Sequence, residues 1–304
     1  MKKIQITVLG IGKMGSQIAK RLQTAGFNVN GWNLTSDPIE EFGKLGIFIS
    51  TKIEDVASID ESISRIFWLM IPQENVDDFL TGKLSDYLRA GDIIIDGGNS
   101  FYKDSIRRAE QLEKNRVTFF DCGTSGGISG EKNGFALMVG GPKEYWLEIE
   151  PLIKSLSSGD NYAYLGASGA GHFTKMVHNG IEYGMMESIA EGYAILEASP
   201  YHLNLNDVTK TYQKGSVISS RLIDLCADIF RTENINNTIG IIDATGEGEW
   251  TLKVAKELNI DARVIEDSFH IRQESHNLEN QNKFSNKIVS LLRKHFGGHS
   301  TYLK

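Results

Sequence analysis

The residues whose types and spacing best suit catalysis lie between residues 171 and 184. At about 100° per residue, Lys175, Asn179 and Glu182 fall on one helical stripe, with His178 beside it. A lysine and a carboxylate two turns apart are spaced to flank a small substrate as general base and general acid. The alternative is a solvent-exposed face, the usual meaning of a polar stripe. The four side chains differ in kind and do not repeat surface charges, but periodicity alone leaves both interpretations open.

The other side of this predicted helix carries apolar side chains. We expect that side to form the core face, through Met176, Val177, Ile181 and Met185. Gly180 and Gly184 weaken a helix, so their presence indicates that another group approaches closely.

A glycine motif near the start of the chain has the pattern of a dinucleotide-binding loop. Gly10-Ile11-Gly12-Lys13-Met14-Gly15 matches G-x-G-x-x-G and stands between a β-branched run and a helical pattern. There Gly10 allows the tight turn, Gly12 lets the backbone approach a pyrophosphate, and Gly15 lets helix and strand pack closely. The N-terminus of the following helix offers N–H groups to the phosphates. An ordinary glycine-rich turn is the alternative, which the strand–turn–helix context disfavours.

The segment after the second predicted strand bears on the choice between NAD and NADP. A carboxylate there binds the ribose 2′-hydroxyl, whereas an arginine favours a 2′-phosphate. Neither group stands at the expected place. The side chains of Asn33, Thr35 and Ser36 can hydrogen-bond either form, whereas Leu34 cannot pair with a phosphate. Asp37 lies further on and is expected to be a loop residue or a helix cap. The predicted cofactor is NAD or NADP, with the preference open.

Two polar loops are predicted at the same sheet edge. Residues 96–100, Asp-Gly-Gly-Asn-Ser, follow one buried strand, and the glycine-rich residues 123–130 follow the next. Either loop alone is typical of an ordinary polar turn. Together, at the carboxyl ends of neighbouring strands, they favour a ligand site with backbone N–H groups available to anions.

Several other classes of chemistry lack their motifs. The sequence has no G-x-S-x-G elbow of a Ser/His/Asp hydrolase, and its seven histidines show no metal-binding spacing, so no metal is expected. Cys122 and Cys226 have no C-x-x-C partner and are expected to be reduced core thiols.

Length and charge set the broad class. The 304 residues exceed the size of most single cores, so two domains are expected. A formal net charge of −7 without any basic run argues against nucleic-acid binding. No apolar stretch approaches the roughly 18–20 residues of a membrane span, and the first residues do not resemble a signal peptide. We therefore expect a cytoplasmic protein without membrane contact.

Up to about residue 165 the sequence alternates short buried strands with helical patterns. Strands are predicted at residues 4–10, 27–33, 65–71, 92–96 and 117–122, then at 134–139 and 162–165. Helices are predicted at residues 13–26 and 172–198, with more helix up to residue 293. This order predicts an α/β Rossmann-like doubly wound domain at residues 1–167. An all-α substrate and oligomerisation domain is expected at residues 168–304.

These motifs together resemble the decarboxylating 6-phosphogluconate dehydrogenases, in their short-chain form, within the β-hydroxyacid dehydrogenase superfamily. Residues 96–100 and 125–127 match the superfamily, whereas residues 171–184 and the tail 293–299 match the 6-phosphogluconate branch. The resemblance covers nearly the whole chain. It implies oxidative decarboxylation of 6-phosphogluconate to ribulose 5-phosphate and CO2 with reduction of NAD(P)+, in the pentose phosphate pathway or gluconate catabolism.

The resemblance also implies roles for single residues, with Lys175 as general base and Glu182 as general acid. The sugar-acid site would be lined by Asn99, Ser125, Gly126, Gly127, His178 and Asn179. The substrate phosphate would be bound by Tyr183, Arg272, Arg293 and His299, the last two from a neighbouring subunit of a dimer or tetramer. The cofactor would be bound by Gly10, Gly12, Met14, Gly15, Asn33, Leu34, Thr35 and Asn99.

Two segments depart from the family pattern. NADP-preferring members carry Asn-Arg-Thr where this chain has Asn33-Leu34-Thr35, so the arginine for the 2′-phosphate is missing. In the loop of residues 245–251, Thr245 stands where longer members have lysine, and Glu247 and Glu249 make the loop acidic. Both departures concern affinity and cofactor choice rather than the reaction type.

Two other functions compete with this one. A dehydrogenase of the 3-hydroxyisobutyrate type would share the fold and the lysine, but a small unphosphorylated acid needs no cationic phosphate set. A non-catalytic NAD(P)-sensing module would not need Lys175 and Glu182 together.

Overall fold

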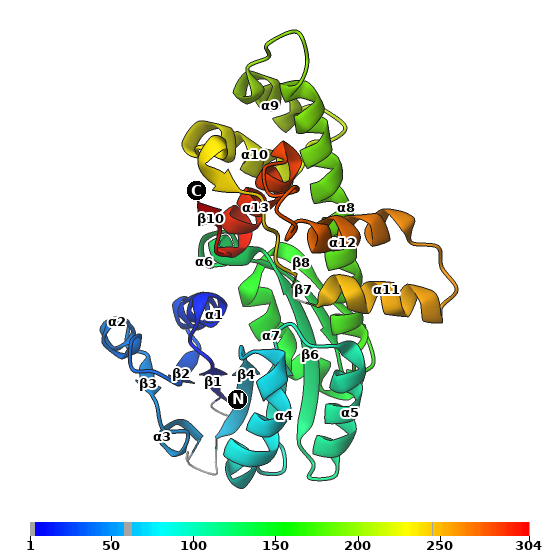
Figure 1. Ribbon diagram of the computed structural model, residues 1–304. Coiled ribbons are helices and arrows are strands. Elements are labelled where there is room, and N and C mark those ends of the chain that lie inside the picture. The colour runs from blue at the N-terminus through cyan, green and yellow to red at the C-terminus, as the bar shows by residue number, and fades with distance from the viewer. Residues whose placement is uncertain (1–3, 58–62, 245, 304) are drawn as a thin grey trace. The chain divides into compact units, whose positions relative to one another are not determined.

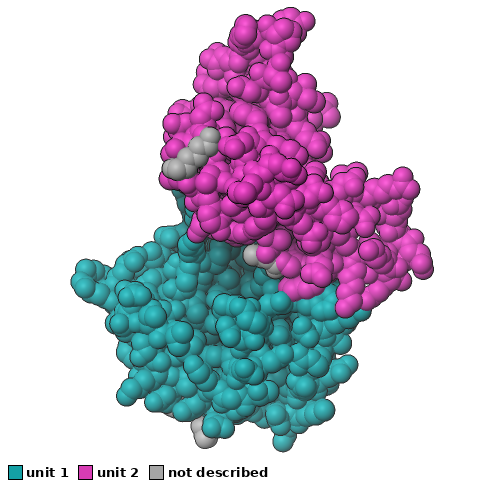
Figure 2. All heavy atoms as spheres, viewed as in Figure 1, with its two compact units in different colours: residues 1–175 teal, residues 176–304 magenta. Residues whose placement is uncertain are grey.

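The chain forms two compact units, Met1–Lys175 and Met176–Lys304 (Figures 1 and 2). This computed structural model describes residues 4–57, 63–244 and 246–303, and Thr245 lies outside them. The division falls inside the long helix α8 (Ala170–Glu197), later in the chain than the boundary predicted at residue 167.

Unit 1 is built on an eight-stranded sheet with the order β3-β2-β1-β4-β5-β6-β7-β8. All neighbouring strands pair in parallel except β6 and β7, which are antiparallel. The strands are β1 (Ile4–Leu9), β2 (Asn28–Trp32), β3 (Phe48–Ser50), β4 (Ser64–Leu69), β5 (Ile93–Asp96), β6 (Thr118–Ser125), β7 (Phe135–Gly140) and β8 (Ser157–Gly166). The helices before α8 are α1 (Lys13–Thr24), α2 (Ile39–Lys44), α3 (Glu54–Ala57), α4 (Val76–Asp78), α5 (Tyr102–Glu113), α6 (Gly130–Asn133) and α7 (Trp146–Leu156).

The sheet is buried on both faces because its strands alternate apolar side chains between two cores. On one face Ile66 and Trp68 of β4 pack with side chains of α1 and α7, such as Ile18 and Ile153. On the other face Phe67 and Leu69 pack with the residues around α3, α4 and α5. The predicted doubly wound α/β architecture is confirmed.

Unit 2 is helical, as predicted. Its core joins the second half of α8 to α9 (Leu205–Gln213), α10 (Arg221–Thr232) and α13 (Phe284–Gly297). Helices α11 (Glu247–Glu257) and α12 (Arg263–Glu274) also belong to this unit. A small antiparallel pair, β9 (Thr238–Ile239) and β10 (Tyr302–Leu303), holds the end of the chain, and periodicity did not predict it. None of the helices in the described ranges combines the length and apolar content that crossing a bilayer requires.

The structure corrects two predictions about local elements. Ile181 and Met185, expected in the core face of α8, are 54% and 42% exposed, whereas Met176 is buried as predicted. Strand β6 continues to Ser125, so the first residues of the predicted loop at 123–130 belong to the sheet. Pairing with β7 supplies this extension, which a pattern of apolar residues alone does not reveal.

The two cysteines have the environment expected of core thiols. Cys122 and Cys226 are both free and buried. Burial raises the pKa of Cys122 far above its usual value and that of Cys226 to about 12, so neither is a reactive thiolate at neutral pH.

Candidate active site

The glycine loop after β1 has the close contacts that its motif predicts. Gly10 has a φ of +101°, and its N–H donates to the Trp32 carbonyl at 2.8 Å. A Cβ on Gly15 would lie 1.9 Å from the Gly10 carbonyl oxygen, so only glycine allows α1 to start against the strand. A Cβ on Gly12 would meet nothing within 4 Å. At Gly10 and Gly15 the loop therefore packs tightly against other protein atoms, whereas at Gly12 the backbone is accessible. Bound phosphates require such an accessible backbone.

A hydrogen-bonded turn follows β2. Asn33 Oδ1 accepts from the Ile11 N–H at 3.0 Å, and Asn33 Nδ2 donates to the Thr35 carbonyl at 3.0 Å. The Thr35 hydroxyl donates to Asp37 Oδ2 at 2.9 Å, so this carboxylate reaches back toward the turn and is not a helix cap. Leu34 is 72% exposed at the tip. The turn therefore joins the glycine loop to a carboxylate and presents no cation at its tip.

These two segments fit a nicotinamide dinucleotide. The open backbone at Gly12 and the N-terminus of α1 would hold the pyrophosphate, and the turn at 33–37 would meet the adenosine ribose. Met14 of the motif packs against the sheet core rather than away from it.

The loop after β5 is held by a buried network around Asp96. Its Oδ1 accepts from the Gly98 N–H at 3.1 Å, and its Oδ2 accepts from the Ser100 hydroxyl at 2.8 Å. Arg108 of α5, which is 3% exposed, donates to Asp96 at 3.3 Å and to Ser100 at 3.1 Å. The network fixes both sides of Asn99, the predicted ligand-binding residue of this loop.

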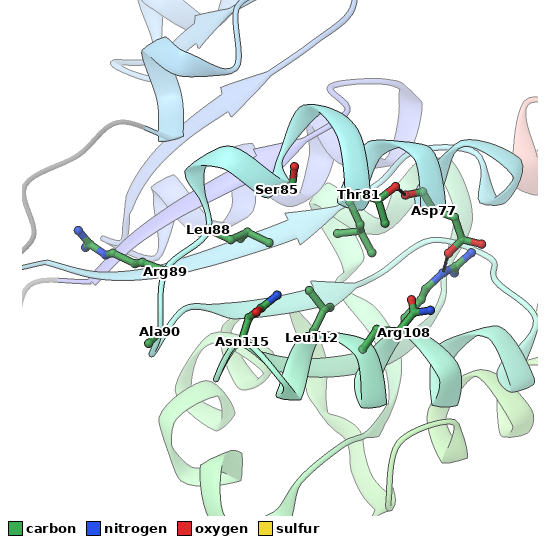
Figure 3. Close-up of a pocket in the computed structure, with 11 residues that line it drawn as sticks. Asp77, Thr81, Ser85, Leu88, Arg89, Ala90, Arg108, Leu112 and Asn115 are labelled. Carbon is green, nitrogen blue, oxygen red and sulfur yellow. Dashed lines mark hydrogen bonds and ion pairs between the residues drawn. The ribbon is translucent and has the colours of Figure 1, made fainter.

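A pocket of about 560 Å³ borders this network at Arg108 (Figure 3). At one end Asp77 and Arg108 form an ion pair of 2.7 Å, and at the other Ala90 and Asn115 come just before β5 and β6. Burial works to raise the pKa of Asp77, but hydrogen bonds from Arg108 and Arg107 lower it below its usual value. The pocket therefore runs from Arg108, which contacts the carboxyl end of β5, to the residues before β5 and β6, and none of its lining residues belongs to the predicted site.

The first turn of α8 is anchored by Asp121, a fully buried carboxylate on β6. It accepts hydrogen bonds from the N–H groups of Gly169 at 2.6 Å and His172 at 2.8 Å. The His172 ring in turn meets the Ser105 hydroxyl of α5 at 2.7 Å. A carboxylate at a helix N-terminus is favourable for both hydrogen bonding and the helix dipole.

Glycines bring the start of α8 directly onto the sheet, and this contact places Lys175. A Cβ on Gly123 of β6 would lie 2.4 Å from the Lys175 Cβ. A Cβ on Gly171 would lie 2.4 Å from the Met138 carbonyl oxygen, and one on Gly140 would lie 2.7 Å from the Gly171 nitrogen. Ser125, Gly126 and Gly127 follow Gly123 at the end of β6, with positive φ at both glycines. Unit 1 thus brings Lys175 and this predicted substrate-binding segment to the end of one strand.

The remaining polar stripe of α8 lies in unit 2 and is not a freely solvated face. Asn179 is 9% exposed, and its Oδ1 lies 3.1 Å from His178 Nδ1. The same imidazole nitrogen lies 3.7 Å from Glu182 Oε2. These contacts order the three side chains with respect to one another.

The two glycines of α8 allow neighbouring helices to approach, as predicted. A Cβ on Gly180 would lie 2.7 Å from the Thr251 methyl group on α11, and one on Gly184 would lie 3.2 Å from Val264 on α12. Thr251 also donates its hydroxyl to the Met176 carbonyl at 2.8 Å. The close approach is made by protein helices.

Unit 2 brings three of the four predicted phosphate-binding residues into one buried cluster. The Arg272 guanidinium carbon lies 3.2 Å from the centre of the Tyr183 ring, a close cation–π contact. Arg293 is 5% exposed and lies close enough to Tyr183 and Glu247 of its own chain for their charged forms to affect its pKa. Burial lowers the pKa of both arginines, and burial raises the pKa of Tyr183 although Arg272 opposes this. His299 lies in the tail, where its ring contacts Phe296 edge-on.

The acidic loop contributes one buried and one exposed carboxylate. Glu247 is 6% exposed within this cluster, whereas Glu249 faces solvent. In the described part of the chain, no group of three or more His, Cys, Asp or Glu side chains is placed to hold a metal ion.

Sequence reasoning missed three buried charged residues that organise the site. Arg108 and Asp121 support the segments that carry Asn99 and Lys175, and Glu187 lies 3.8 Å from Arg272. The sequence did contain a signal for these residues. Each is a charged residue inside an otherwise apolar strand or on the buried side of a helix.

Comparison with known proteins decides the family. The model for the NAD binding domain of 6-phosphogluconate dehydrogenase matches residues 5–166, and the model for the C-terminal domain of that enzyme matches residues 171–301. The chain belongs to the 6-phosphogluconate dehydrogenase family.

Individual 6-phosphogluconate dehydrogenases agree with the assignment. The NAD(+)-dependent decarboxylating 6-phosphogluconate dehydrogenase of Haloferax volcanii is 35% identical over 99% of each chain. The solved Plasmodium falciparum 6-phosphogluconate dehydrogenase superposes with a TM-score of 0.80 at 26% identity, over 95% of this chain and 70% of that longer chain. A 3-hydroxyisobutyrate dehydrogenase of Salmonella typhimurium, at TM-score 0.74 over 94% of this chain and 99% of that chain, is only 14% identical and shares the fold alone.

Proposed function

We propose that this chain oxidatively decarboxylates 6-phosphogluconate to ribulose 5-phosphate and CO2 with reduction of NAD(P)+. The observation that carries the proposal is the buried cluster of Tyr183, Arg272 and Arg293 on the same helical unit as Glu182. Two buried arginines beside a tyrosine can bind a phosphate group through charge-assisted hydrogen bonds. A dehydrogenase that acts on small unphosphorylated acids does not require such a cationic cluster. The test is the absorbance of reduced nicotinamide with 6-phosphogluconate, compared with 3-hydroxyisobutyrate.

Each catalytic group then has a defined task. A nicotinamide dinucleotide held by the glycine loop at Gly10–Gly15 would supply the hydride acceptor for C3 of the sugar acid. Neutral Lys175 takes the proton of the C3 hydroxyl, and the resulting ammonium stabilises negative charge on the C3 oxygen while CO2 leaves. Glu182 delivers a proton to the carbon that has lost CO2, which becomes C1 of the product, while neutral Lys175 takes the proton of the neighbouring enol oxygen, and this yields ribulose 5-phosphate. Asn99, Ser125, Gly126, Gly127, His178 and Asn179 hold the sugar acid, and no metal takes part.

The turn at residues 33–37 is proposed to give only modest discrimination between NAD and NADP. Leu34 offers no charge to a 2′-phosphate, and Asp37 is engaged by the Thr35 hydroxyl. Leu34→Arg should therefore shift the ratio of kcat/KM values toward NADP, by about tenfold for one good charge-assisted contact. Steady-state rates with each cofactor measure this. A wild-type preference of several thousand-fold, or a Leu34→Arg ratio equal to that of the wild type, contradicts the proposal.

We also propose that the protein self-associates as a dimer or tetramer in the cytoplasm. Exposed apolar side chains on α8 and α12 support this: Ile181 is 54% and Val264 66% exposed. Because Arg293 is buried near Tyr183 of its own chain, we propose that each phosphate cluster uses its own Arg293. The resemblance instead implied that both Arg293 and His299 come from a neighbouring subunit.

The interface assignment predicts the effect of a charge on α8. Ile181→Asp should lower the sedimentation coefficient to that of a monomer, because a closed two-fold interface buries the substituted carboxylate twice. The control Leu147→Asp, at a 76% exposed position on α7, should leave the assembly unchanged. A wild-type monomer would disprove self-association.

A further inference from the structure

Glu187 and Arg272 form a buried pair of opposite charges that is not joined by a hydrogen bond. Glu187, on α8, is 3% exposed and Arg272, on α12, is 1% exposed, and Glu187 Oε1 lies 3.8 Å from Arg272 Nε. That separation is too long for a hydrogen bond. Among the described residues, six buried side-chain nitrogen and oxygen atoms have no hydrogen-bond partner, and three are Glu187 Oε1, Glu187 Oε2 and Arg272 Nε. A buried ion pair without hydrogen bonds is poorly stabilised in its charged form.

The surroundings of the pair explain which of its members titrates. Burial raises the pKa of Glu187 to about 7, with Glu191 on the same helix adding to the effect and Arg272 opposing it. Arg272 also interacts with Tyr183 and Glu182 of α8 and with Arg293 of α13. Arginine stays protonated throughout the neutral range, so the proton equilibrium of the pair belongs to Glu187.

We propose that Glu187 is a proton-linked counter-charge to Arg272 that sets the net charge of the phosphate-binding cluster. The inference rests on the proposed function, since it takes Arg272 as a ligand of the substrate phosphate. Ionised Glu187 neutralises Arg272 from within the protein and repels a phosphate dianion. When Glu187 is protonated, the positive charge of the Arg272 guanidinium is not neutralised within the protein and can interact with the substrate phosphate. Glu187 is thus a positioning residue that acts through Arg272 and does not touch the substrate.

The direction of the pH effect follows from the charges. A bound phosphate dianion disfavours ionised Glu187, so binding shifts its proton equilibrium toward the neutral form. Near pH 7, Glu187 is ionised in about half of the free protein molecules. Binding of the phosphate should therefore be accompanied by uptake of up to about half a proton per protein chain. Each pKa unit of this shift corresponds to about a tenfold loss of affinity on the alkaline side.

Calorimetry of 6-phosphogluconate binding near pH 7, in two buffers of different ionisation enthalpy, measures the proton count. Wild type should take up more protons than Glu187→Gln, which keeps the shape of the side chain and cannot ionise. The substrate Kd of wild type should equal that of the variant near pH 6 and exceed it about tenfold near pH 8.5. Glu197→Gln, a charge-matched control at an exposed position of α8 that does not contribute to the pKa of Glu187, should keep the wild-type proton uptake. Equal proton uptake and equal pH dependence in wild type and Glu187→Gln would overturn the proposal.

A second measurement separates this inference from the proposed function. Folded Glu187 binds its proton more tightly than the unfolded chain does, so its ionisation costs stability as the pH rises from about 4 to 7. The Tm of Glu187→Gln relative to wild type should therefore be higher near pH 8 than near pH 5. If wild type fails to bind 6-phosphogluconate, the proposed function fails, and inorganic phosphate replaces it as the calorimetric probe of the cluster. A Tm difference independent of pH would refute the titration of Glu187 whatever the substrate.

Discussion

Replacing Lys175 by methionine lowers the single-turnover rate of cofactor reduction by about 10²–10⁴-fold, the range of a general base. Methionine keeps the length and apolar stem of the side chain but cannot accept the C3 hydroxyl proton. NAD(P) binding, followed by fluorescence titration, should be unchanged, because the glycine loop at Gly10–Gly15 makes no use of the ammonium group.

Glu182→Gln provides the contrast that separates the two catalytic roles. Glutamine cannot protonate C1, so the variant should reduce the cofactor in the first turnover and then slow at later steps, by a factor in the same range. Near-normal cofactor reduction by Lys175→Met would show that another group is the base. If both variants lowered the rate of cofactor reduction in the first turnover by the same factor, the assignment of one residue as base and the other as acid would be wrong.

Gly123→Ala should lower kcat by about 10²-fold while NAD(P) binding is retained. The added Cβ would lie 2.4 Å from the Lys175 Cβ and 3.0 Å from the Gly171 carbonyl oxygen, so the start of α8 must move away from β6. A displacement of about 1 Å of a reacting group costs roughly this factor. Steady-state kinetics and cofactor titration measure the two effects separately.

Gly192→Ala is the matched control for this substitution. It lies on α8 as well, but a Cβ there meets nothing within 4 Å, so activity should remain at the wild-type level and the Tm should rise slightly. Full activity of Gly123→Ala would mean that contact with the sheet does not position Lys175.

The sequence predicted the elements that depend on short-range patterns. The strands of unit 1 are specified by β-branched runs, and the turn after β1 is specified by Gly10 and Gly15, where a side chain does not fit. Helix α8 was also predicted, but the burial of its faces was partly wrong. Ile181 and Met185 are apolar yet exposed, because α11 and α12 pack on the side of Gly180 and Gly184 instead.

The buried charges could not be predicted in the same way. Asp121, Arg108 and Glu187 each act on residues outside their own element, such as Asp121 on His172 and Glu187 on Arg272. Local periodicity carries no information on such contacts, since only tertiary packing brings the partners together. The two-residue strands β9 and β10 escaped prediction for the same reason, because each exists only through its pairing with the other.

The central claim is that this chain couples oxidation at C3 of 6-phosphogluconate to loss of C1 as CO2. The most direct test supplies 6-phosphogluconate labelled at C1 and measures labelled CO2 and reduced nicotinamide in the same reaction, with Lys175→Met as the blank. The account predicts that both products form in equal amounts with wild type and that neither exceeds background with Lys175→Met. Reduced cofactor without labelled CO2, or neither product from wild type with either NAD or NADP, would contradict it.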